Sequence, residues 1–123
     1  MAVAVVTISA ADWLSLGLEI VGFCPRRQNV CLKTKLERFR AHFGVSPETH
    51  QAIYVDLQTT EIATARIPAP DAFYFLMAFH WLKVYPTEAQ SSAIFKCDDK
   101  TVRGEVWKYV QPVLLAWDKF LSS

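Results

Sequence analysis

Basic and polar side chains gather around residue 100, in the segment DDKTVRGEVWKYV. Lys100, Thr101, Arg103 and Lys108 stand close together there, with Gly104 among them. Lysine and arginine bind phosphate oxygens, and arginine and threonine can also hydrogen-bond the base edges in the major groove of DNA. This set predicts contacts with a nucleic acid. A solvated helix face gives the same charge pattern about as often, so both interpretations stand at this point.

A second basic segment lies earlier in the chain, and only Glu37 opposes it. Its bases are Arg26, Arg27, Lys33, Lys35, Arg38 and Arg40. The whole chain has 13 Lys and Arg against 12 Asp and Glu, so its net charge predicts no polyanion partner. The local clusters are what favour phosphate contacts, and Arg38 and Arg40 are the candidates in this segment.

Cysteine and histidine could bind a metal, but their spacing here is unfavourable. Cys24, Cys31, His42 and His50 supply four zinc-binding side chains, yet CPRRQNVC separates its thiols more widely than paired zinc ligands usually are. We expect no metal site and no cofactor. Three cysteines are an odd number, and the start of the chain lacks the basic residues of a secretory signal. Reduced thiols and a nuclear or cytoplasmic location are therefore expected.

The elements that position these side chains are predicted to be helices. The chain has 123 residues, 52% of them hydrophobic, which suits one domain with a single core. Start signals, stop signals and helical periodicity predict an all-α bundle of five to six helices ending in a helix-turn-helix. The expected helices cover about 9–23, 32–43, 47–59, 72–85, 88–95 and 99 onward, and TTEIATARIPAP is expected to be a loop.

Two regions are distinguished along the chain. Residues 1–31 are expected to form an apolar N-terminal helix and a basic linker, and residues 32–123 the helical helix-turn-helix domain. The apolar helix is expected to pack on the domain, to self-associate or to bind a protein partner. No apolar run approaches the roughly 20 residues of a membrane-spanning helix, so no membrane contact is expected.

The helix-turn-helix prediction is specific to residues 86–117. Pro86 and Thr87 begin a short helix, EAQSSAIF, and KCD breaks it before a longer helix with apolar residues at helical spacing. In such motifs the second helix lays its early exposed residues on base edges. Lys96 stands where glycine is usual, and Asp98 with Asp99 brings negative charge toward DNA. The same pattern is also a common packing unit.

Three phrases of the sequence carry a resemblance to a known family. RFRAHFGVSP, FLMAFHWLKVYPTEAQ and DDKTVRGEVWKYV resemble the region that precedes the nuclease domain in Harbinger-type DDE-superfamily transposases, over roughly residues 36–117. The resemblance implies a helix-turn-helix that recognises transposon ends, with Lys100, Thr101 and Arg103 at its reading positions. Glu105 departs from the family pattern, which would have a bulky apolar residue there.

The resemblance also bears on catalysis. Such transposases carry three catalytic carboxylates on a ribonuclease-H-like sheet, and the chain ends at Ser123 before any such domain. Scattered acids such as Asp56, Asp71 and Asp118 do not replace that site. We therefore expect no enzyme activity.

These observations predict a transposase-derived DNA-binding module that binds double-stranded DNA. The alternatives are a truncated relic without activity and a protein-interaction domain. In the latter, a surface of aromatic residues would dock a partner, with Phe73, Trp81, Trp107 and Trp117 as its members.

Overall fold

The computed structural model describes residues 5–23 and 30–122, which fold into helices with no strand among them. The all-α prediction is confirmed. The helices are α1 (Ala10–Ile20), α2 (Leu32–Phe43), α3 (Pro47–Thr59), α4 (Glu61–Arg66), α5 (Ala72–Val84), α6 (Glu88–Phe95) and α7 (Asp99–Ser122). No helix in this described part is both long and apolar enough to cross a membrane.

Local hydrogen bonds explain why the helices begin where they do. The Ser9 hydroxyl accepts from Asp12 N at 3.1 Å, and the Ser46 hydroxyl accepts from Thr49 N at 3.2 Å just before Pro47. The Asp71 carboxylate accepts from Phe73 N at 2.8 Å and caps α5. Such caps satisfy backbone donors that have no partner within the helix, so short sequence signals are enough to place them.

Gly22 ends α1 earlier than the sequence predicted. Its φ is 78°, and the Phe23 N–H donates to the Leu18 carbonyl at 2.9 Å, the pattern of a Schellman motif. The helix was expected to run to about residue 23, where Pro25 would stop it. Glycine reaches positive φ without steric cost and stops the helix first, at Ile20.

The helix count predicted from the sequence is wrong, because the expected loop at residues 59–70 contains α4. The described residues therefore form seven helices, not five to six. Ala63 and Ile67 are buried, and α4 packs on α3 and α7. A helix of six residues is too short to be stable alone or to show periodicity, so its stability comes from this packing.

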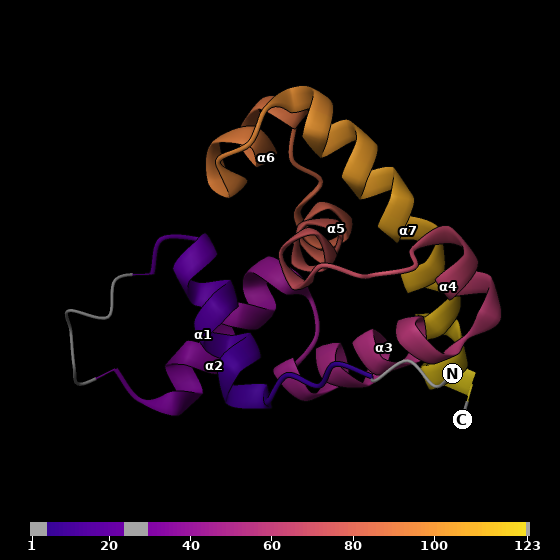
Figure 1. Cartoon of the computed structure of the whole chain (residues 1–123). Coiled ribbons are helices and arrows are strands. Elements are labelled where there is room, and N and C mark those ends of the chain that lie inside the picture. Colours follow the sequence, from indigo (N-terminus) through magenta and orange to yellow (C-terminus); the bar gives the residue numbers. More distant parts are fainter. Residues whose placement is uncertain (1–4, 24–29, 123) are drawn as a thin grey trace.

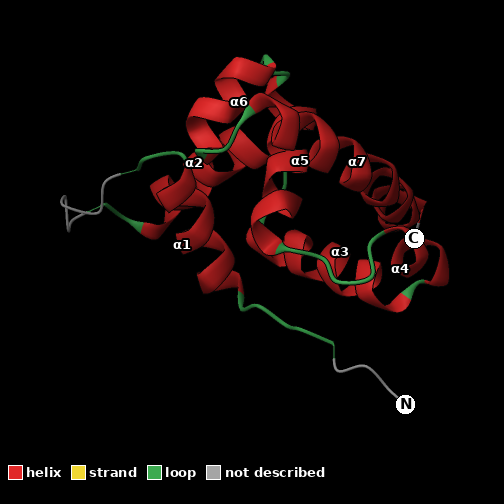
Figure 2. Cartoon of the chain, turned by 45° about the horizontal axis from the view of Figure 1, so that its top comes forward, coloured by secondary structure: helices red, strands yellow, loops and turns green. Residues whose placement is uncertain are grey.

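The centre of the molecule is α5, which packs against α2 on one side and α7 on the other (Figure 1). Six successive residues, from Phe75 to His80, are buried there, as expected of a helix that is apolar nearly all round. Figure 2 shows α7 running beside α5 and on toward α3 and α4.

Tyrosine hydroxyls anchor the segment before α5: Tyr54 donates to the Pro70 carbonyl at 2.7 Å, and Tyr109 accepts from Asp71 N at 2.7 Å.

The N-terminal helix α1 shares the same core. It packs against α2 and α3, and Trp13 is completely buried there beside Tyr54 and Phe75. Trp13 Nε1 donates to Gln51 Oε1 at 2.8 Å. The predicted boundary after residue 31 falls between α1 and α2, and the apolar face of α1 is covered by α2 and α3.

Candidate nucleic-acid interface

Helices α6 and α7 pack together and are joined by a three-residue turn. Lys96 ends α6 with φ 54° and ψ 46°, a left-handed conformation that glycine adopts more easily. The Cys97 N–H donates to the Ser92 carbonyl at 3.2 Å, and the Ser92 hydroxyl donates to the Cys97 carbonyl. These two hydrogen bonds join Ser92 and Cys97 across the turn. They hold Lys96 in the left-handed conformation, at a position where glycine is usual.

Small and apolar side chains fill the contact between α6 and α7. Ser91 and Phe95 are buried on α6, and Val102 and Val106 are buried on α7. Their spacings of four residues place each pair on one helix face. The N-terminal part of α7 therefore exposes its opposite face to solvent.

That exposed face contains most of the predicted site residues. Lys100, Arg103, Gly104 and Lys108 are exposed, and Thr101 is half-buried. Gly104 has open space around it, since a Cβ added there would meet nothing within 4 Å. These residues recur at spacings of three and four, so α7 brings them to one side of the helix.

The first acid of the turn region is a helix cap. Asp98 Oδ1 accepts from Thr101 N at 2.7 Å, and this hydrogen bond lowers the pKa of Asp98 below its usual range. Asp98 therefore stays ionised near neutral pH and keeps a negative charge beside Lys100. The negative charge that the sequence indicated at this turn thus belongs to a group that the start of α7 requires.

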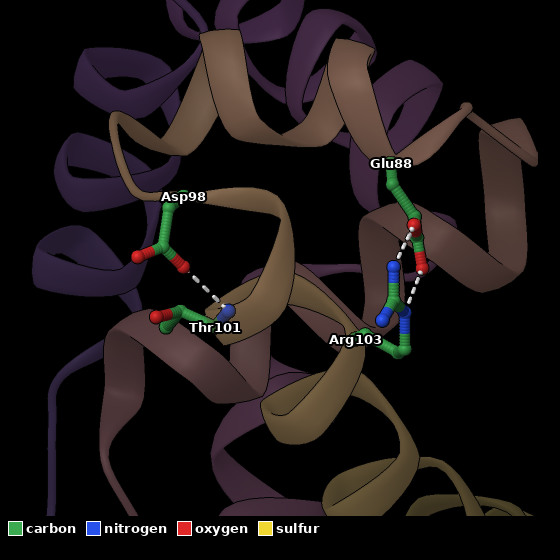
Figure 3. A network of polar contacts seen from close by, with 4 residues as sticks. All are labelled: Glu88, Asp98, Thr101 and Arg103. Carbon is green, nitrogen blue, oxygen red and sulfur yellow. Dashed lines mark hydrogen bonds and ion pairs between the residues drawn. The ribbon is translucent and has the colours of Figure 1, made fainter.

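Arg103 is paired with Glu88 in the structure (Figure 3). Its Nε donates to Glu88 Oε2 at 2.8 Å and its Nη2 donates to Glu88 Oε1 at 2.9 Å. The hydrogen bonds from Arg103 lower the pKa of Glu88. Sequence reasoning missed Glu88, and the signal that could have indicated it was an acid in the first turn of α6.

The predicted residues on α2 lie apart from this pair of helices. Arg38 and Arg40 are exposed on α2, whose main partners are α1 and α5. The Arg38 guanidinium lies 5.3 Å from the centre of the Phe23 ring, a cation–π contact that ties it to the end of α1. Helical spacing therefore places Lys100, Arg103 and Lys108 on one side of α7, whereas Arg38 and Arg40 lie on a different helix, α2.

Aromatic side chains extend the exposed face of α7. Trp107 is 56% exposed and its ring centre lies 5.2 Å from that of Trp81, which in turn lies 6.1 Å from Tyr85. Tyr85 is 75% exposed. Trp13 is buried in the core, whereas Trp107 lies at the surface.

The other aromatic candidates, Phe73 and Trp117, are half-buried. Trp117 lines a groove of about 330 Å³ together with Leu114 and Phe43. It is thus separated along α7 from Trp107.

The zinc-binding side chains considered from the sequence form no cluster among the residues that the structure describes. Cys24 lies outside the described residues. Cys31 is exposed and hydrogen-bonds Thr34, while His50 is buried and its Nδ1 lies 2.9 Å from the Ser46 carbonyl. Within residues 5–23 and 30–122, no group of three or more metal-binding side chains lies close enough together to hold an ion.

Half-buried His42 lies against His80, which is buried in the core. The rings of His42 and His80 stack with centres 6.0 Å apart, and burial lowers the pKa of His80 to about 4. Burial also lowers the pKa of His50 to about 4. The neutral form of His50 and His80 fits their buried positions.

Comparisons with protein families, with curated proteins and with solved structures found no match to this chain.

Proposed function

We propose that this chain is a transposase-derived DNA-binding module that contacts duplex DNA through α6 and α7 and carries no nuclease activity of its own. The observation that supports the proposal best is the start of α7. There Lys100, Arg103 and Lys108 share one exposed face, directly after the hydrogen-bonded turn that joins the short helix α6 to α7. This is the position from which the second helix of a helix-turn-helix contacts the major groove.

Roles within the interface follow from side-chain chemistry. Arg103 is suited to base edges, because a guanidinium offers paired donors. Lys100 and Lys108 are suited to phosphates, and Thr101 lies between them near the N-terminus of α7. Gly104 leaves room for the DNA backbone, since its surroundings are open. Arg38 and Arg40 are proposed only as additional phosphate contacts. A nuclear or cytoplasmic location is proposed together with this function.

The test is binding to duplex DNA of random sequence, measured by fluorescence anisotropy across a salt series. With two phosphate contacts, from Lys100 and Lys108, affinity should fall roughly twelvefold between about 50 and 200 mM salt. Lys100→Ala/Arg103→Ala should weaken binding, and the lost phosphate contact of Lys100 should flatten the slope of log affinity against log salt by about 1.

A matched control removes two positive charges from other exposed positions. Lys33→Ala on α2 combined with Lys83→Ala on α5 changes the net charge equally and should leave the slope nearly unchanged. Arg38→Ala/Arg40→Ala shows whether α2 contributes. A folded protein that does not bind at low salt would rule out the DNA proposal.

The aromatic surface of Trp81, Tyr85 and Trp107 favours a second candidate, a protein-interaction domain. Aromatic side chains with large exposed areas are enriched at the centres of protein interfaces. Such docking would be nearly independent of salt and would be lost in Trp107→Ala. The two candidates are thus separated by the same salt series.

A further inference from the structure

The ion pair between Glu88 and Arg103 joins the first turn of α6 to the second turn of α7 (Figure 3). Both hydrogen bonds are short, and together they form the bidentate arrangement in which arginine and carboxylate fit each other best. The Arg103 side chain is 61% exposed and the Glu88 side chain is 43% exposed. Exposed ion pairs contribute only modestly to stability, and bidentate geometry favours the upper end of their usual range, so stabilisation of the fold is a small effect of this pair.

Each residue of the pair lies near the start of a helix whose first turn is held by capping hydrogen bonds. Thr87 and Gln90 form a capping box around Glu88, with Thr87 N donating to Gln90 Oε1 at 2.8 Å and Gln90 N donating to the Thr87 hydroxyl at 3.1 Å. The cap by Asp98 fixes the start of α7 below Arg103. The backbone at Glu88 and the backbone at the start of α7 are therefore both held by capping hydrogen bonds, and the ion pair joins these two helix starts.

The pair uses only one edge of the guanidinium. Nε and Nη2 donate to Glu88, which leaves the edge formed by Nη1 and the second N–H of Nη2. Figure 3 shows the third nitrogen of Arg103 on the side away from Glu88. Two parallel N–H donors at that edge match the O6 and N7 acceptors that guanine presents in the major groove.

We propose that Glu88 is a specificity-determining positioning residue, which holds Arg103 with its Nη1–Nη2 edge directed at a guanine of the DNA site. The inference rests on the proposed DNA binding and adds a base preference to it. A carboxylate near a duplex weakens binding to all sequences. An orienting role offsets that loss, because a fixed arginine gives up less side-chain freedom when it binds its base.

The experiment begins with selection of bound sequences from a random duplex pool at one fixed salt concentration. The position read by Arg103 is the one at which Arg103→Ala relaxes the preference. Affinities for duplexes with guanine or adenine at that position are then compared for the wild type and Glu88→Gln. Glu19→Gln, which removes the same charge from an exposed position on α1, is the control.

We expect the wild type to prefer guanine by about 5- to 150-fold, the range for a bidentate pair. Glu88→Gln should reduce this preference at least about fivefold, a loss of about 1 kcal/mol of discrimination. Its affinity for random duplex should stay equal or rise. Glu19→Gln should change neither. In the protein without DNA, the Arg103 Nε–H signal in NMR spectra should exchange faster with water in Glu88→Gln than in the wild type.

Each contrary result has a definite meaning. If the wild type binds DNA and Glu88→Gln keeps the full guanine preference, the role of Glu88 is refuted while the DNA proposal stands. The same conclusion follows if Glu88→Gln strengthens binding to all sequences equally, or if the wild type has no base preference. A folded wild type that does not bind any duplex refutes both proposals.

Discussion

The same substitution, glycine to alanine, should have opposite effects at two helical positions of this protein. Gly17 lies on α1 where it packs against α2, and a Cβ there would approach Phe39 Cε2 to 2.5 Å and Phe43 Cε2 to 2.9 Å. Both phenylalanine rings are completely buried. At Gly104 on α7 a Cβ would meet nothing within 4 Å.

The magnitudes follow from two terms. Alanine in place of glycine inside a helix favours folding by about 1 kcal/mol, and at Gly104 this is the whole effect. At Gly17 the rings must move by roughly 1 Å to restore ordinary carbon contacts, and overpacking a filled core costs about 3 kcal/mol at the upper end of its usual range. Gly17→Ala should therefore lower the free energy of unfolding by about 2 kcal/mol, and Gly104→Ala should raise it by about 1 kcal/mol.

The assay is urea unfolding followed by circular dichroism at 222 nm. A difference of about 3 kcal/mol between the variants should separate their midpoints by about 2 M urea with similar slopes. Phe39→Leu should cost less in the Gly17→Ala background than in the wild type, since the smaller side chain makes room for the new methyl group. If Gly17→Ala is as stable as the wild type, α1 does not pack on α2 at this point and the reasoning is refuted.

Three further predictions concern the buried histidines, the turn before α7 and the anchor of α1. Because the pKa values of His50 and His80 are lowered to about 4, the unfolded chain takes up protons below about pH 6.5 that the folded protein does not. Each histidine should thus lower the free energy of unfolding by about 2 kcal/mol between pH 7 and pH 5, and His80→Phe should flatten the dependence of the urea midpoint on pH. Lys96→Gly should raise the thermal midpoint, because it relieves a left-handed conformation that costs roughly 1 kcal/mol in lysine; an unchanged midpoint would contradict this. Gln51→Ala leaves the indole N–H of Trp13 without its acceptor and should destabilise the protein by about 1 to 3 kcal/mol in the same urea assay, whereas Gln51→Glu should retain most of the stability.

Local sequence sets where most of these helices begin, because caps act within three or four residues. Ser9, Ser46, Asp71 and Asp98 each accept a hydrogen bond from a backbone N–H just inside the following helix. The sequence also indicates that α5 lies at the centre of the molecule, because a helix that is apolar nearly all round has to be covered on every side. The exposed face of Lys100, Arg103 and Lys108 followed from helical periodicity and the buried valines between them.

Which helices pack against each other depends on the three-dimensional arrangement of the whole chain. The helix α4 forms because α3 and α7 cover Ala63 and Ile67, which the local sequence does not reveal. Trp13 and Trp107 are the same residue type on apolar helices, yet one is buried and the other exposed, because packing determines which face is covered. The pairing of Glu88 with Arg103 likewise depends on the angle between α6 and α7. Contacts between residues distant in sequence depend on how whole helices pack, and no local pattern encodes that arrangement.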